Sequence, residues 1–397
     1  MVDTIVHHVE AIISQVAQKS LQATQPEVIK DGSRSRVIRY TTAHHTIPSV
    51  IVKTIEQDES CGFSEWASLQ FLSTIDNLAG SQPYFYGGHK EARLVVMQDL
   101  GRAANLGELF DDGHRPTILA ALSHMAQHMA HLVGHTRGQE ALFEKMRAQL
   151  PGYQTVGRHV EAQRWCDGRI KLGHWFEALR VPTPPGFDRV FYHIATVYMQ
   201  PGPWLSFSHG DPAPTNNHIS TAGVRLLDFE YGAFRHALYD LTAWNILCPL
   251  PEAWIQLMMN CFQQQVIPWL PEGGNEKTFQ EAWALICAYR ALALITWLPL
   301  TILTVDRPWV GRWTMREAFM STCIRLHNAV ADVPSLAALT QLSQNLIGAA
   351  RDRWPEVGDG TLKWGAGTLE EGIENAKSRL NFSDYGRDHT VSRQNGC

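Results

Sequence analysis

The pattern of hydrophobic and polar residues divides the chain into a strand-rich first part and a longer helical part. Two runs rich in β-branched residues, 36–40 and 50–55, are separated by a polar turn that ends at Pro48. This arrangement predicts an antiparallel strand pair, and a third apolar run over 92–97 predicts another strand. Between them, apolar residues recur every third position over 63–72, which is the spacing of a helix.

After Gly101 the pattern is helical almost throughout. Strand-like stretches in this part are limited to 205–209 and 224–229. The sequence from Pro355 onward is polar and glycine-rich, and we expect the final residues of such a tail to be disordered. A small strand-rich lobe joined by one segment to a larger helical lobe is typical of a cleft enzyme. The apolar periodicity predicts long helices over 117–135, 252–266, 276–298, 314–330 and 334–353.

Composition and charge narrow the class of protein. Hydrophobic residues make up 45% of the 397 residues and charged residues 18%, which is ample for a hydrophobic core. The 34 Lys and Arg residues against 39 Asp and Glu residues leave a net charge of −5. That balance argues against a nucleic-acid-binding protein, which would carry a basic excess.

One apolar stretch, 283–303, is nearly long enough to span a membrane. Arg290 lies within it and Pro299 interrupts it, so we interpret it as a buried helix and expect no membrane partner. The seven cysteines are scattered and none has Cys-x-x-Cys spacing, and the N-terminus lacks the pattern of a secretion signal. We therefore expect a cytoplasmic protein without a disulfide framework.

The most informative segment runs over 208–231. Asp211 and Asn216 lie five residues apart, and Asp228 follows after a second apolar stretch. Phosphoryl transfer needs a carboxylate near the attacking hydroxyl and oxygen ligands for Mg²⁺ on the triphosphate. Asp211 suits the first role, and Asn216 and Asp228 suit the second. The alternative interpretation is a loop whose polar residues only cap helices.

The sequence resembles the aminoglycoside phosphotransferase / choline kinase family. The resemblance covers most of residues 30–330 and implies ATP- and Mg²⁺-dependent phosphorylation of a small-molecule hydroxyl. It also implies an α+β, bilobal protein-kinase-like fold, with a small antiparallel-sheet N-lobe (1–98), a hinge (99–101), a large helical C-lobe (102–354) and a polar tail (355–397). The motifs that carry it are His209-Gly-Asp211-x-x-x-x-Asn216, Asp228-Phe-Glu230-Tyr231 and Tyr239-Asp240-Leu241.

Lys53, inside the strand-like run 50–55, is the first upstream residue that fits this interpretation. An ammonium buried without a partner is costly, so a lysine here is expected to face a cleft, contact phosphates and pair with a carboxylate. Glu65 on the following helix is the natural partner and matches a family glutamate. The alternative is a surface lysine on an edge strand.

Other residues receive supporting roles. The hydroxyls of Ser33 and Ser35, in a turn ahead of the strand pair, could bind phosphate oxygens, although an ordinary hairpin fits them equally well. Gln98 and Leu100 lie where the backbone between the lobes would bind adenine. Asp240 is expected to accept hydrogen bonds from the backbone of the loop that begins at His209. A separate residue, Glu230, would either reach the metal through water or face the solvent.

The sequence predicts less about the residues that would bind the acceptor. Residues 245–353 contain eight acids and eight bases, without the acidic surplus that a polycationic aminoglycoside favours. Trp309 and Trp313, together with Glu230, are candidates to line an acceptor pocket, and we expect a compact acceptor of low net charge or with a single amine. Two alternatives to a small-molecule kinase are a non-catalytic nucleotide- or ligand-binding protein and a protein kinase. Only eleven residues separate Asp228 from Asp240, which leaves no room for an activation segment. The sequence leaves the oligomeric state and the choice between ATP and GTP open.

Overall fold

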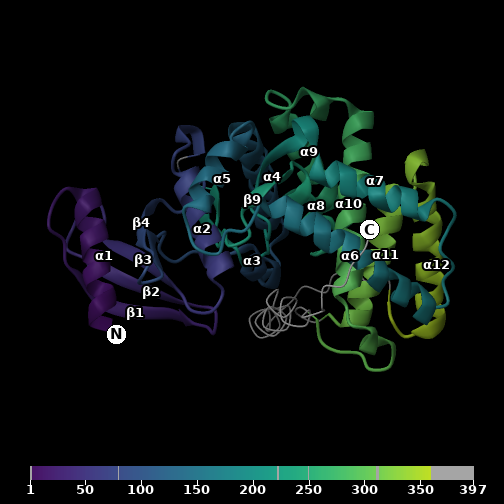
Figure 1. The fold of residues 1–397 in the computed structure, drawn as a ribbon, viewed down its shortest axis with the longest axis horizontal. Helices are drawn as coiled ribbons and strands as arrows, with labels where there is room; N and C mark the ends of the chain where they lie inside the picture. The colour runs from purple at the N-terminus through teal and green to yellow at the C-terminus, as the bar shows by residue number, and fades with distance from the viewer. Residues whose placement is uncertain (1, 79, 221–222, 249, 310–312, 359–397) are drawn as a thin grey trace, which may run out of the picture.

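A five-stranded antiparallel sheet forms the first lobe of the protein, on the left of Figure 1. The computed structural model describes residues 2–78, 80–220, 223–248, 250–309 and 313–358. The strand order is β1-β2-β3-β5-β4. The strands are β1 (Ala23–Asp31), β2 (Ser35–Thr42), β3 (Ser49–Ile55), β4 (Phe85–His89) and β5 (Leu94–Gln98).

Two helices cover this sheet, α1 (Val2–Ala17) and α2 (Glu59–Leu72). Successive side chains of a strand point to opposite faces. In β3, Val50 and Val52 therefore pack in the cluster that includes α1, whereas Ile51 and Ile55 pack in the main core with α2. Lys53 shares the face of Ile51 and Ile55, so the alternation of β3 directs its side chain toward α2.

The sequence pattern predicted part of this lobe. The strands β2, β3 and β5 and the helix α2 correspond to predicted elements, whereas α1, β1 and β4 were not predicted. The helix α2 begins at Glu59, because the Asp58 side chain accepts a hydrogen bond from the Cys61 backbone N–H at 3.0 Å and caps it. Strand β1 lies at the sheet edge with almost every residue exposed, so it lacks the apolar alternation on which prediction depends.

The remainder of the described chain is mainly helical and holds two small antiparallel strand pairs. One pairs β6 (Leu205–Ser208) with β9 (Ala233–His236), and the other pairs β7 (Asn217–Ser220) with β8 (Gly223–Leu226). Short 3₁₀ helices cover Asp76–Leu78, Gly202–Trp204, Pro271–Gly274, Leu300–Leu303 and Pro334–Leu336. The α-helices are α3 (Leu106–Asp112), α4 (Arg115–Thr136), α5 (Glu140–Ala148), α6 (Gly157–Ala178), α7 (Phe187–Met199), α8 (Tyr239–Ile246), α9 (Glu252–Val266), α10 (Glu276–Trp297), α11 (Met315–Val330) and α12 (Ala337–Arg353).

The helix α10 contains the first part of the apolar stretch 283–303, which continues past Pro299 into the 3₁₀ helix Leu300–Leu303. It is buried along most of its length, as predicted, and the Arg290 guanidinium lies 3.5 Å from the centre of the Tyr239 ring. Among the residues that the structure describes, no helix has the length and apolarity needed to cross a bilayer. Residues 359–397, which make up most of the predicted polar tail, lie outside the described residues.

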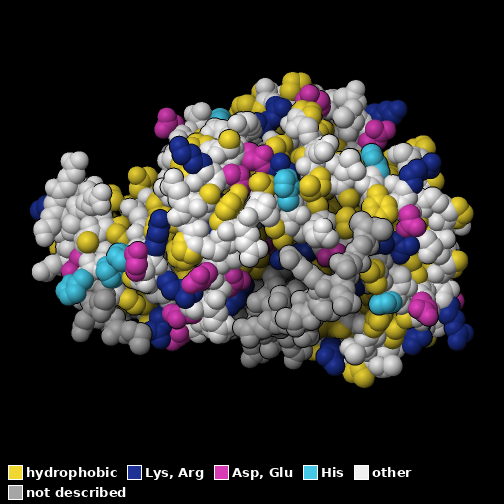
Figure 2. Space-filling view, in the orientation of Figure 1, with side chains coloured by type: hydrophobic (Ala, Val, Ile, Leu, Met, Phe, Trp, Pro, Cys, Tyr) yellow, Lys and Arg dark blue, Asp and Glu magenta, His cyan; other side chains and the backbone are white. Residues whose placement is uncertain are grey.

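The predicted fold class is confirmed. An antiparallel-sheet lobe precedes a larger, mainly helical lobe, as in a bilobal protein-kinase-like fold (Figure 1). Basic and acidic side chains are interspersed over the face drawn in Figure 2. The β6–β9 and β7–β8 pairs flank the segments that carry Asp211, Asn216 and Asp228, so these short strands position the proposed catalytic and metal-binding residues.

Candidate active site

Lys53 joins three parts of the molecule. Its Nζ lies 2.6 Å from Glu65 Oε2 in α2 and 2.6 Å from Asp228 Oδ1 in the C-lobe. The Glu65 side chain is only 3% exposed. Burial by itself would lower the pKa of Lys53, but the charges of Asp228 and Glu65 outweigh it and hold the pKa well above its usual value. The lysine is therefore a buried cation, and the predicted pairing with Glu65 is present.

Asp228 adopts an unusual backbone conformation between β8 and β9. Its φ of +64° lies in the left-handed region, which residues other than glycine, asparagine and aspartate seldom adopt. The turn brings its carboxylate to Lys53 across the two lobes, and the side chain keeps 27% of its surface exposed. A carboxylate in that setting is accessible from solvent where the two lobes meet.

Asp211 and Asn216 meet in the loop between β6 and β7. The Asn216 Nδ2 donates to the Asp211 backbone carbonyl at 3.0 Å and to its Oδ2 at 3.3 Å. The amide nitrogen of Asn216 is thereby engaged, which leaves Oδ1 as the oxygen that could ligate a metal. The spacing of five residues brings the two side chains together, as the predicted loop requires.

The buried carboxylate of Asp240 holds the start of this loop. It accepts hydrogen bonds from the backbone N–H groups of His209 at 2.6 Å and Gly210 at 2.9 Å, so the expectation for Asp240 is confirmed. The His209 ring donates from Nε2 to the Leu227 carbonyl at 2.7 Å, and its Nδ1 accepts from the Asp211 N–H at 3.3 Å. His209 thus ties the Asp211 loop to the residue that precedes Asp228.

Gly210 is required by its surroundings. Its φ is +90°, and a Cβ at this position would lie 2.4 Å from the Tyr231 carbonyl oxygen. A side chain there would displace the backbone that follows Asp228. This close approach explains why no arginine occupies the position, as it would in the protein-kinase loop.

The turn between β1 and β2 contacts the C-lobe through Arg34. The sequence pointed to Ser33 and Ser35 in this turn and not to Arg34. The Arg34 guanidinium lies 3.2 Å from Glu230 Oε1 and donates to the Tyr231 hydroxyl at 3.3 Å. The Glu230 side chain is only 10% exposed, so the interpretation that it faces the solvent is wrong. The sequence signal that could have identified Arg34 is its positive charge in a turn that was expected to cover phosphates.

These residues surround a small cavity. Its lining includes Arg34, Ser35, Lys53, Gly62 and Glu230. Two cationic residues and a serine therefore line a space between the β1–β2 turn, the start of α2 and the segment after Asp228, together with the acidic residues Asp58 and Glu230. Cationic groups and hydroxyls of this kind bind phosphate oxygens.

The segment between the lobes is anchored by Asp99. Its carboxylate accepts from Arg39 Nε at 2.6 Å, from the Ser49 hydroxyl at 2.7 Å and from the Gly101 N–H at 2.9 Å. Burial would raise the pKa of Asp99, but the Arg39 and Ser49 hydrogen bonds dominate and lower it. Sequence reasoning missed this aspartate because no local motif marks it.

The adenine-binding roles of Gln98 and Leu100 stay predictions. The Gln98 backbone N–H donates to the Tyr84 carbonyl at 2.8 Å, so it serves the sheet. Trp309 and Trp313 are 9% and 5% exposed and belong to the hydrophobic core of the C-lobe. Their place in an acceptor pocket likewise stays a prediction, and the structure shows both as core residues.

Several solved structures are similar to this chain. A choline kinase from Cryptosporidium parvum is 10% identical, with a TM-score of 0.46 over 90% of this chain and 96% of that one. A choline kinase from Streptococcus pneumoniae is 15% identical, with a TM-score of 0.42 over 84% and 99%. An aminoglycoside 2′-phosphotransferase-IIIa in complex with GDP is 13% identical, with a TM-score of 0.47 over 82% and 99%.

No protein-family model and no curated protein sequence matches the chain. The similar structures include both choline kinases and aminoglycoside phosphotransferases. Their sequences are 10–15% identical to this chain, and their TM-scores lie between 0.42 and 0.47. The roles of individual residues therefore rest on the contacts within this site.

Proposed function

We propose that this protein is an ATP- and Mg²⁺-dependent phosphotransferase that moves the γ-phosphate of ATP to a hydroxyl of a small molecule. The observation that carries the proposal is the contact of Lys53 with both Glu65 and Asp228, 2.6 Å to each. A buried ammonium held by two carboxylates at the junction of the lobes costs desolvation free energy that a hydrophobic contact would not. Phosphate binding by Lys53 would explain why this buried ion pair is present despite that cost.

Asp211 is assigned the role of positioning the acceptor hydroxyl and accepting its proton. Its Oδ2 already accepts a hydrogen bond from Asn216, which fixes the orientation of the carboxylate. Lys53 and Arg34 are assigned to the phosphates, because both line the small cavity beside Asp228. Glu65 keeps Lys53 in place from the side of α2.

The donor atoms at the site fit Mg²⁺. The ion prefers oxygen ligands and is usually held by one or two carboxylates together with substrate phosphates. The Asp228 carboxylate and the Asn216 Oδ1 would hold it. When bound, Mg²⁺ would neutralise phosphate charge during transfer.

The acceptor is proposed to be compact, with low net charge or a single amine. Eight acids and eight bases in residues 245–353 give no acidic surplus. A polycation bound there would lack complementary carboxylates. Choline kinases and aminoglycoside phosphotransferases, both among the similar structures, define the two acceptor types to compare.

The test is turnover of ATP or GTP with Mg²⁺ against a panel of amino alcohols, sugars, other hydroxylated metabolites and aminoglycosides. Phosphorylated product should appear with at least one acceptor and should disappear in Lys53→Met. Nucleotide binding without any product across the panel would favour a non-catalytic binding protein. An aminoglycoside as the best acceptor would contradict the proposed acceptor class while supporting the reaction.

A further inference from the structure

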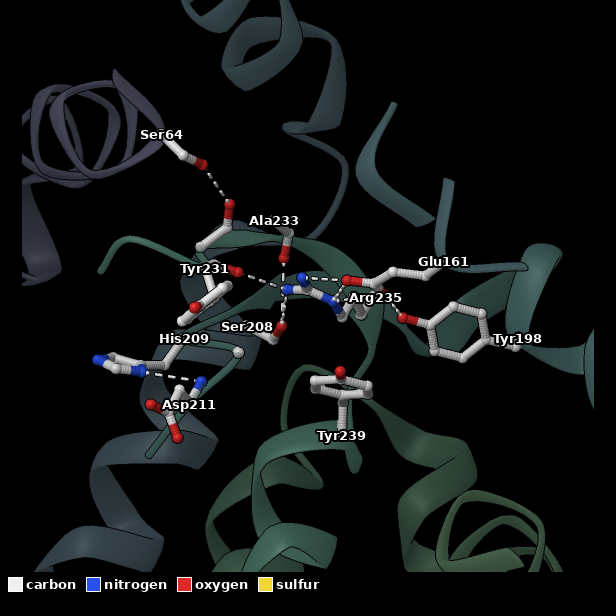
Figure 3. A network of polar contacts seen from close by, with 12 residues as sticks. Ser64, Glu161, Tyr198, Ser208, His209, Asp211, Tyr231, Ala233, Arg235 and Tyr239 are labelled. Atoms are coloured by element: carbon white, nitrogen blue, oxygen red, sulfur yellow. Dashed lines mark hydrogen bonds and ion pairs between the residues drawn. The ribbon is translucent and has the colours of Figure 1, made fainter. Parts of the chain in front are cut away.

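Arg235 in β9 is a buried cation at the centre of Figure 3. Its side chain is only 5% exposed. Its Nε donates to Glu161 Oε1 and Oε2 in α6 at 3.0 and 2.9 Å, and its Nη2 lies 2.5 Å from Oε1. The Tyr198 hydroxyl in α7 donates to the same carboxylate. One end of the guanidinium is thus fixed to the helical core.

The other end of Arg235 reaches the two segments that carry the proposed chemistry. Its Nη1 donates to the Ser208 hydroxyl at 2.9 Å and to the Tyr231 backbone carbonyl at 2.9 Å (Figure 3). Ser208 immediately precedes the loop of Asp211. Tyr231 lies three residues after Asp228, and its carbonyl packs against Gly210. A single nitrogen therefore joins both segments.

We propose that Arg235 is a positioning residue for phosphoryl transfer: by joining Ser208 to the Tyr231 carbonyl, it sets the placement of the Asp211 loop relative to Asp228. This inference rests on the proposed function. Arg235 touches neither nucleotide nor acceptor in this assignment and acts through the two segments that it joins.

The chemistry of the side chain supports a role beyond stability. A buried ion pair often stabilises a fold no more than well-packed apolar residues of the same volume. The planar guanidinium, however, presents several donors in a fixed fork, which apolar residues and lysine cannot reproduce. Here the fork meets a carboxylate, a hydroxyl and a carbonyl from three elements. A misplacement of about 1 Å in such a framework can cost roughly 10²-fold in rate.

The decisive variant is Arg235→Lys. Lysine keeps a positive charge for Glu161 but cannot also span Ser208 and the Tyr231 carbonyl in fork geometry. We expect kcat to fall by roughly 10- to 100-fold, the scale of a positioning error. The KM for ATP should stay within about three-fold, because Arg235 contacts neither Lys53 nor Arg34. The variant should therefore keep its ground-state binding of ATP.

Arg158→Lys is the matched control. Arg158 lies in the same helix as Glu161, pairs with Glu140 and donates to the Met199 carbonyl at 3.2 Å, so it contacts neither active-site segment. We expect it to lower the Tm to a similar degree with kcat unchanged. Both variants are assayed well below their Tm. An Arg235→Lys enzyme with wild-type kcat and a lowered Tm would show a purely structural arginine and overturn the proposal.

Ser208→Ala keeps the test decisive if Arg235→Lys does not fold. It removes one of the two bonds at Nη1 and leaves the Arg235–Glu161 ion pair intact. We expect kcat to fall by roughly three- to ten-fold, the equivalent of one hydrogen bond, with the KM for ATP retained. An unchanged kcat in this variant would also overturn the proposal. Failure of the proposed function is distinguishable, because the wild-type protein would then lack turnover before any variant is compared.

Discussion

The charges around Lys53 determine how the site can receive a nucleotide. Three carboxylates act on Lys53, those of Asp228, Glu65 and Glu230, and the cavity lining adds Arg34 as a second cation and Asp58 as a fourth carboxylate. Four acidic and two basic side chains leave a formal net charge of −2. An anionic triphosphate is repelled by such a site unless a divalent cation accompanies it. Nucleotide affinity should therefore depend on Mg²⁺.

Asp228→Gly tests the metal ligand without disturbing the backbone. Glycine adopts a φ of +64° freely, so loss of binding reports the missing carboxylate. We expect ADP with Mg²⁺ to stop raising the Tm of this variant, measured by thermal shift with and without the ion. Asp228→Asn, which keeps an oxygen donor and tolerates this conformation, is the matched control. An undiminished Mg²⁺-dependent shift in Asp228→Gly would place the metal elsewhere.

Asp211→Asn should separate chemistry from binding. The carboxamide keeps an oxygen for Asn216, but it cannot accept the proton of the acceptor hydroxyl. We expect kcat to fall by roughly 10²–10⁴, the usual scale for a general base, with the KM for ATP within a few-fold. Both constants are measured by steady-state kinetics with the best acceptor. Near-normal turnover would remove Asp211 from the mechanism.

At the scale of elements, the β1–β2 turn contacts the C-lobe through Arg34. Arg34→Ala removes a cation from the phosphate side and leaves Glu230 buried without that partner. We expect the KM for ATP with Mg²⁺ to rise by about ten-fold, equivalent to ~1.4 kcal/mol, with a smaller effect on kcat. Arg36→Ala is the control, because Arg36 pairs with Asp31 at the exposed start of β2. Equal KM values for the two variants would contradict a role for Arg34 in nucleotide binding.

The elements and contacts that the sequence predicted are those with local signals. The β-branched run of β3 and the helical spacing of α2 placed Lys53 opposite Glu65, and the motif around Asp211 placed Asn216 beside it. Arg34, Asp99 and Arg235 were missed because their partners lie 196, 60 and 74 residues away in the chain. Strand β4 was missed because two glycines interrupt its pattern. In α1, however, Ile5, Val9 and Ile13 have helical spacing that could have identified the helix.

At the scale of the whole molecule, two buried histidines make stability depend on pH. Burial lowers the pKa of His128 to about 4, aided by His131 and His209, and burial lowers that of His236 to about 3. Unfolded histidine titrates near 6.5, so the unfolded chain binds more protons as the pH falls below that value. The stability from both neutral rings is fully present above pH 6.5 and decreases as the pH falls toward 4.

The free energy of unfolding, measured in urea, should therefore decrease below pH 6.5 by up to about 1.4 kcal/mol per pH unit for each histidine. His128→Gln and His236→Gln should each make that decline shallower, whatever their effect on stability at neutral pH. The same slope in wild type and in both variants would show that other groups cause the acid sensitivity.

The left-handed backbone at Asp228 also limits how this site can change during evolution. A residue with a larger or branched side chain would strain the turn as well as remove the carboxylate, so selection would act against it even where catalysis no longer matters. Asparagine and glycine avoid that strain, and single-nucleotide changes convert an aspartate codon into either. Under the proposed function, descendants of this protein that lose catalysis while keeping the fold should therefore carry one of these two residues here. The identity of this position in divergent homologues would then distinguish lineages under selection for phosphate chemistry from lineages under selection for folding alone.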